Sequence, residues 1–157
     1  MSDLPPPEQK KKRKSGIPTG NAGEYFVMGE LLRRGYAAQL ADRNTQGYDL
    51  LAGTVNSSTM RKIQVKTVRQ QPWFVRVSDF DPSLPDQVTV YVLLGTEEAK
   101  KPVRFFVARN SDLAGKFHHP PDWKAQGKGS AFMKLKDVEP FENNWESAIS
   151  SNEDGSS

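Results

Sequence analysis

The chain has 157 residues, a net charge of +3 and no cysteine, and 36% of its residues are hydrophobic. This length fits one domain with tails, and the missing cysteines exclude disulfides, thiolate zinc sites and a cysteine nucleophile. No apolar run approaches the roughly 18 residues of a membrane helix, and the N-terminus lacks the apolar core of a secretory signal. The composition therefore favours a cytoplasmic protein without a membrane span.

The net charge is concentrated at the N-terminal end. Residues 1–16 contain five cations and two acids, whose difference equals the net charge of +3, so the remainder is neutral. We expect a disordered basic tail at residues 1–17, one domain at residues 18–149 and a disordered acidic tail at residues 150–157. The five cations are Lys10, Lys11, Lys12, Arg13 and Lys14. Such a segment is either a solvated tail or a polybasic arm that holds phosphates without reading sequence.

The first predicted helix covers residues 22–34 and carries a carboxylate among its apolar positions. Glu24 falls near the middle of the apolar stripe that the helical period predicts. Burying a lone carboxylate is costly, so Glu24 requires a partner such as a metal or a lysine. Alternatively, Asn21 and Glu24 form a capping box at the start of the helix. Gly35 is expected to end the helix in the left-handed conformation. The predicted stripe contains Tyr25, Val27, Met28, Leu31 and Leu32.

Short runs of β-forming residues follow, and residues 88–94 are apolar enough for a buried central strand. A short helix capped by Asn110 or Ser111 and a C-terminal helix or turn over residues 138–149 complete the expected elements. The other strands are predicted at residues 36–41, 47–52, 62–67, 73–77, 103–108 and 131–135, with exposed loops at residues 78–87 and 118–130.

The runs at residues 47–52 and 62–67 are joined by turn formers, which suits an antiparallel hairpin. Because side chains alternate between the faces of a strand, Gln64 and Lys66 point together to one side while their neighbours point to the core. In such a hairpin Asp49 can lie beside both. A carboxylate, an amide and an ammonium then share one patch of the sheet.

The order of these residues resembles the PD-(D/E)XK nuclease superfamily. The similarity lies in Gly47-Tyr48-Asp49, a spacer and then Gln64-Val65-Lys66, with Gln in the second acidic position of the family pattern. Gly23-Glu24 at the opening of a helix is similar to the archaeal Holliday-junction-resolvase branch and to related small bacterial endonuclease domains. The resemblance covers residues 20–68. It implies an α/β, restriction-endonuclease-like fold with a mixed central sheet flanked by helices.

The resemblance also implies an activity, that of a Mg²⁺-dependent DNA endonuclease in which Mn²⁺ can substitute. The implied catalytic residues are Glu24, Asp49, Gln64 and Lys66. Glu24, Asp49 and Gln64 hold the metal through oxygen atoms, the ligands that Mg²⁺ prefers. Lys66 orients the attacking water or neutralises the phosphate in the transition state. The expected substrate is duplex or branched DNA, with RNA as the lesser alternative, and enzymes of this type often act as homodimers.

Other interpretations of the same residues stay open. Asp49 and Lys66 can form a cross-strand ion pair on an exposed sheet face without any catalytic role. The alternative function is a catalytically inactive nucleic-acid-binding module of the same fold, because the amide of Gln64 is a weaker metal ligand than a carboxylate. The cations around the second strand of the hairpin are either a phosphate-binding track or a solvated face, and they are Arg61, Lys62 and Arg69.

Overall fold

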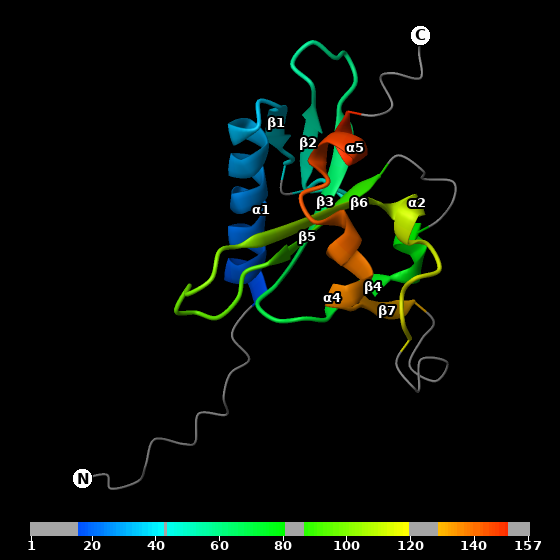
Figure 1. Cartoon of the computed structure of the whole chain (residues 1–157). Helices are drawn as coiled ribbons and strands as arrows, with labels where there is room; N and C mark the ends of the chain where they lie inside the picture. Colours follow the sequence, from blue (N-terminus) through cyan, green and yellow to red (C-terminus); the bar gives the residue numbers. More distant parts are fainter. Residues whose placement is uncertain (1–15, 43, 81–86, 120–128, 151–157) are drawn as a thin grey trace, which may run out of the picture.

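The computed structural model describes residues 16–42, 44–80, 87–119 and 129–150. The predicted basic run at residues 10–14 and the end of the predicted acidic tail lie outside these ranges. The described chain forms a five-stranded sheet covered on one face by helix α1 and on the other by a smaller sheet with short helices (Figure 1).

The five-stranded sheet has the order β1-β2-β3-β5-β6. β3 and β5 are parallel neighbours, whereas the other adjacent strands run antiparallel. This mixed sheet with packed helices confirms the predicted α/β class. The strands are β1 (Ala37–Leu40), β2 (Leu50–Gly53), β3 (Arg61–Val68), β5 (Val88–Leu93) and β6 (Arg104–Arg109).

Helix α1 (Gly16–Arg33) begins earlier than the predicted start at residue 22. Pro18 lies in its first turn, where the missing N–H would have no intrahelical partner in any case. Asn21 and Glu24 are consequently inside the helix, so the predicted capping box is wrong. The helix ends as expected, because Gly35 has φ of +90° and the N–H of Tyr36 reaches back to the Leu31 carbonyl at 3.0 Å.

The buried side of α1 is narrower than the predicted stripe. Val27 and Leu31 are fully buried against the sheet, but the side chains of Tyr25 and Leu32 are 62% and 52% exposed, contrary to the sequence-based expectation. The cause is a close approach at Gly23, where an added Cβ would lie 1.7 Å from the hydroxyl oxygen of Thr67. Because of this contact, the side of α1 that carries Gly23, Val27 and Leu31 faces the sheet.

A second layer covers the opposite face of the sheet. β4 (Trp73–Arg76) and β7 (Ser130–Met133) pair antiparallel, and β4 therefore belongs to a separate two-stranded sheet. Trp73 is fully buried, donates its indole N–H to the Val92 carbonyl at 3.1 Å, and packs edge-on against Tyr91. A second apolar cluster, distinct from the one beneath α1, results.

The helices after β6 are shorter than predicted. α2 (Asn110–Leu113) is followed by Gly115 with φ of +82°, and its N-cap is Arg109 without a side-chain cap, so Asn110 and Ser111 are not the cap. The helix or turn expected over residues 138–149 is divided into several short elements. The chain there forms α4 (Leu135–Val138), the 3-10 helix η2 (Glu139–Phe141) and α5 (Trp145–Ile149).

Two residues explain the interruption near the C-terminus. Pro140 has no N–H to continue the α-helical ladder, and Asn143 adopts a left-handed conformation with φ of 54°. Trp145 and Ile149 nevertheless reach the core, as their spacing predicts, because α5 presents both to the cluster beneath α1.

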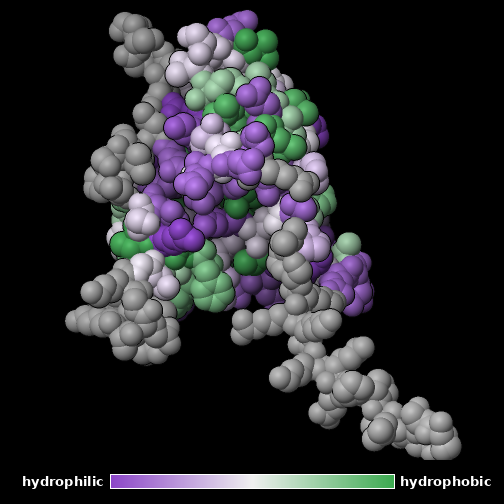
Figure 2. Space-filling model, turned by 180° about the vertical axis from the view of Figure 1, so that it is seen from behind, coloured by the Kyte–Doolittle hydropathy of each residue, from purple (hydrophilic) through white to green (hydrophobic). Residues whose placement is uncertain are grey.

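No helix in the described part of the chain combines the length and the apolarity that a membrane crossing requires. Seen from behind, the molecule shows hydrophilic side chains gathered across the middle of its surface, with apolar side chains in smaller groups around them (Figure 2).

We expect Gly23→Ala to destabilise the fold by about 1–3 kcal/mol, because the new methyl group must displace Thr67 or the helix. The matched control is Gly29→Ala on the same helix, where an added Cβ meets nothing within 4 Å. This control should be neutral or stabilising by up to about 1 kcal/mol, owing to helix propensity. Chemical denaturation followed by circular dichroism measures both, and equal losses in the two variants would contradict the close contact.

Candidate active site

The hairpin of β2 and β3 brings Asp49 to the segment of β3 that carries Gln64. The strands pair antiparallel, with Leu50 opposite Ile63 as the last pair before Asp49. Lys66 lies two residues beyond Gln64 and therefore on the same face of β3. The predicted hairpin is thus present, and Asp49 hydrogen-bonds the two residues that flank Gln64.

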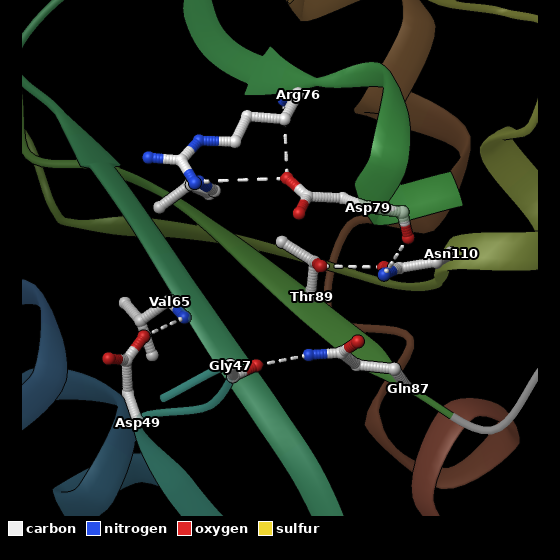
Figure 3. A network of polar contacts seen from close by, with 9 residues as sticks. Gly47, Asp49, Val65, Arg76, Asp79, Gln87, Thr89 and Asn110 are labelled. Atoms are coloured by element: carbon white, nitrogen blue, oxygen red, sulfur yellow. Dashed lines mark hydrogen bonds and ion pairs between the residues drawn. The ribbon is translucent and has the colours of Figure 1, made fainter. Parts of the chain in front are cut away.

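Asp49 lies where the two strands separate. β2 pairs with β3 only as far as Ile63, whereas β3 continues to Val68 beside β5. The N–H of Asp49 donates to the Ile63 carbonyl, and its carboxylate oxygen Oδ2 accepts the Val65 N–H, each at 2.8 Å (Figure 3). The carboxylate thus replaces the ladder hydrogen bond that the departing strand no longer supplies. Its other oxygen, Oδ1, accepts no hydrogen bond from the described residues.

Lys66 has a different partner from the one predicted. Its ammonium lies 3.9 Å from Oδ2 of Asp79, and both side chains are mostly shielded from solvent. Asp79 belongs to the 3-10 helix η1 (Val77–Phe80), where the sequence suggested only a loop. Within the described residues Lys66 forms no ion pair with Asp49, so the predicted cross-strand pair is not formed.

Gln64 is half-buried between these groups. Its side-chain amide makes no hydrogen bond to another described residue, and its neighbour on β5 is the buried Thr89.

Glu24 comes from the other side of the sheet. α1 packs on the face formed by Ile63, Val65 and Thr67, opposite to the face that carries Gln64 and Lys66. Glu24 is half-buried at the edge of this contact, beside Gly23. The structure therefore does not place it on the face of Gln64 and Lys66.

The available oxygen donors fit a Mg²⁺ ion that keeps several of its water ligands. No group of three His, Cys, Asp or Glu side chains within the described ranges is close enough to hold a metal. Asp49 Oδ1 and the Gln64 amide oxygen are nevertheless hard oxygen donors, and Asp49 hydrogen-bonds the two residues that flank Gln64. Mg²⁺ is commonly bound through one or two carboxylates together with waters and substrate phosphates. The chemistry of these two donors is compatible with such a site.

A buried polar network stands next to Lys66 and was not predicted from the sequence. The Asn110 side chain is only 2% exposed; its amide N–H donates to the Asp79 main-chain carbonyl at 2.7 Å, and its oxygen accepts the Thr89 hydroxyl at 2.6 Å. Gln87 extends the network by donating to the Gly47 carbonyl, which ties the turn before Asp49 to the start of β5 (Figure 3). A polar residue directly after the apolar strand β6 was the one available signal, and it was interpreted as a helix cap.

Tyr91 adds an electrostatic feature to this network. It lies beside Lys66 in the β3–β5 register and is almost completely buried. Burial and, second, the negative charge of Asp79 raise the pKa of the Tyr91 hydroxyl far above its usual range. Tyr91 is therefore a neutral phenol, and the counter-charge beside Lys66 is the carboxylate of Asp79.

The predicted phosphate-binding cations do not share one surface. Arg61 lies on the α1 face and is half-buried, where its Nε donates to the Ile149 carbonyl at 2.7 Å. Lys62 is exposed on the face of Lys66, and its ammonium lies 5.3 Å from the centre of the Tyr48 ring. Arg69 follows β3 and contacts the Gly95 carbonyl at 3.4 Å. Only Lys62 thus extends the positive charge of Lys66 along the same face of the strand.

Comparison with known proteins gives similarities at low sequence identity. No family model and no curated protein matches the chain. The structure is similar to Hjc, a Holliday junction resolvase from Archaeoglobus fulgidus, with 16% identity, a TM-score of 0.48, and coverage of 76% of this chain and 87% of that chain. It is also similar to the bacterial homing endonuclease I-Ssp6803I, with 14% identity, a TM-score of 0.45, and coverage of 83% of this chain and 90% of that chain. At these identities and TM-scores, a function can be inferred only from the residues of the candidate site.

The two tasks of Asp49 can be separated by substitution. Asp49→Asn keeps an oxygen that accepts the Val65 N–H, so its free energy of unfolding should stay within about 0.5 kcal/mol of the wild type. Asp49→Ala leaves this N–H without its partner and should cost about 1–3 kcal/mol. Urea denaturation of both variants checks the difference. Equal stability of the alanine and asparagine variants would show that the hydrogen bond contributes nothing to the fold.

Proposed function

We propose that the chain is a Mg²⁺-dependent endonuclease that hydrolyses phosphodiester bonds in DNA. The observation that supports this best is that Asp49 hydrogen-bonds the residues on either side of Gln64, while Gln64 and Lys66 share one face of β3. One anionic oxygen donor, one neutral oxygen donor and one ammonium are what metal-assisted phosphodiester cleavage requires of a protein.

Each residue has a distinct role in this proposal. Asp49 and Gln64 hold the ion through oxygen atoms, and Glu24 contributes from α1. When bound, the ion lowers the pKa of a coordinated water and stabilises the negative charge that develops on the phosphate. Lys66 donates hydrogen bonds to the attacking water or to a phosphate oxygen, and its positive charge favours the transition state more than the substrate.

The protein supplies rigidity to this arrangement. The Oδ2 of Asp49 is already committed to the Val65 amide, so Oδ1 has a defined direction. The turn before Asp49 is held by Gln87, and Lys66 is flanked by Asp79. Groups that are oriented before the substrate binds lose little free energy in the reaction, which is how a preorganised site accelerates catalysis.

A second candidate function is a nucleic-acid-binding module without useful catalysis. It is favoured by the same two contacts, because Asp49 and Lys66 already have partners within the fold. In that case Lys62 and Lys66 contact phosphates, and the ion pair and the hydrogen bond serve stability alone.

The endonuclease proposal predicts metal-dependent nicking of supercoiled plasmid DNA. Mg²⁺ or Mn²⁺ should support cleavage, and chelation by EDTA should abolish it. Asp49→Asn should lose the activity without losing the fold, and Lys66→Ala should reduce it by about 10²–10³-fold, the range for one charge-stabilising donor. Gel electrophoresis of the nicked and linear forms measures the rates. Linear product that increases with protein concentration indicates that two copies cut the two strands.

Matched controls come from exposed residues of the same types. Asp112→Asn on α2 and Lys100→Ala between β5 and β6 should cut like the wild type. Nicking that persists in both Asp49→Asn and Lys66→Ala would exclude the proposed site. Binding without cleavage by the wild type, weakened by Lys66→Ala, would favour the binding module. Duplex DNA, a four-way junction and single-stranded RNA, compared in the same assay, define the substrate class.

A further inference from the structure

The ion pair of Lys66 assigns a role to a residue outside the predicted site. We propose that Asp79 is a positioning residue for Lys66 and supplies the acidic partner that Gln64, as a neutral amide, does not provide. The inference rests on the proposed function. Its geometric basis is the distance of 3.9 Å between the Lys66 ammonium and the Asp79 carboxylate, with side-chain exposures of 23% and 22%.

Asp79 is held by two contacts that leave its carboxylate pointing to Lys66. Its Oδ2 accepts the Arg76 main-chain N–H at 3.2 Å, which fixes the side chain at the start of η1. Its main-chain carbonyl accepts the buried amide of Asn110 at 2.7 Å. Figure 3 shows the side chains of Arg76 and Asp79 next to one another, with Asn110 and Thr89 below Asp79 in this view. An anchored carboxylate restricts a long lysine side chain better than one on a loose loop, because less conformational entropy has to be lost.

The charges around Lys66 explain why an acid is needed there. Lys62 is a second cation on the same face of β3, and Gln64 between them is uncharged. Tyr91, the neighbour on β5, is a buried neutral phenol. Without Asp79 the ammonium of Lys66 would have no carboxylate among the described residues within ion-pair distance. In this proposal Asp79 neutralises the charge of Lys66 and restricts the position of its side chain.

The structural element that carries Asp79 differs from the one that carries Gln64 and Lys66. Asp79 is carried by η1, directly after β4, and not by the β2–β3 hairpin that carries the remaining residues. The small β4–β7 sheet therefore does more than cover the second apolar cluster. It delivers one charged group to the rim of the candidate active site.

The first test is Asp79→Asn, which removes the charge but keeps an oxygen for the Arg76 N–H. We expect kcat for plasmid nicking to fall about tenfold, within the range for residues that orient a reacting group through another one. KM should change little, because the substrate does not contact Asp79 in this proposal. Asp112→Asn, the same chemical change on an exposed residue of α2, should leave both parameters unchanged. A fall in Asp79→Asn accompanied by an equal fall in Asp112→Asn would overturn the assignment.

The second test is rescue. In Asp79→Asn, the further change Gln64→Glu places a carboxylate two residues from Lys66 on the same face of β3. Gln64→Glu also strengthens a proposed metal ligand, so the single variant Gln64→Glu is the reference. We expect Gln64→Glu to raise kcat more in the Asp79→Asn background than in the wild type, because there it also restores an acidic partner for Lys66. An equal gain in both backgrounds would exclude the positioning role.

The third test does not require the protein to be a nuclease. Trace acylation followed by mass spectrometry measures the reactivity of the Lys66 amine, with the exposed Lys100 as internal standard. Loss of a partly exposed ion pair should raise the relative labelling of Lys66 by up to about fivefold in Asp79→Asn and not in Asp112→Asn. Unchanged labelling overturns the pairing, even where Asp49→Asn shows that the nuclease proposal holds. Increased labelling in a protein that cuts no DNA confirms the pairing and excludes the proposed function.

Discussion

The separation of β2 from β3 is the feature on which the candidate site depends. A strand that loses its neighbour exposes main-chain N–H groups, and each buried one needs a new acceptor. Asp49 provides that acceptor for Val65 and is thereby fixed at the point of separation. The same carboxylate is thus part of the fold through one oxygen and open to chemistry through the other. A change in the length of β2 would move the point of separation along β3, and Asp49 would no longer lie beside the segment that carries Gln64.

The two faces of β3 divide the structural and chemical tasks. Ile63 and Val65 contribute to the apolar cluster beneath α1, whereas Gln64 and Lys66 lie on the face that the smaller sheet covers in part. In the described part of the chain η1 lies beside Lys66, whose side chain is 23% exposed. In this intermediate environment charges are screened less than at the surface and are still accessible to a phosphate, which suits a group that stabilises a transition state.

Local sequence rules predicted the part of the site that lies within one hairpin. Alternation along β3 placed Gln64 with Lys66, and the turn-forming connection placed Asp49 opposite them, because register follows from the hydrophobic pattern. These rules did not predict Asp79, the partner of Lys66, or Asn110, which contacts Asp79. Asp79 lies in a stretch with the composition of a loop, and Asn110 resembled a helix cap, since an asparagine that caps and one that bridges buried groups have the same local signature.

The sequence by itself determined the α/β class, the β2–β3 hairpin and the candidate residues Asp49, Gln64 and Lys66, because these depend on periodicity and on short-range pairing. Only the tertiary structure decided which side of the sheet each element covers. It placed Glu24 of α1 across the sheet from Lys66 and brought Asp79 to Lys66 from a different layer. The physical reason is that contacts between layers follow from the packing of whole faces, such as the close approach at Gly23, and no residue pattern along the chain encodes them separately.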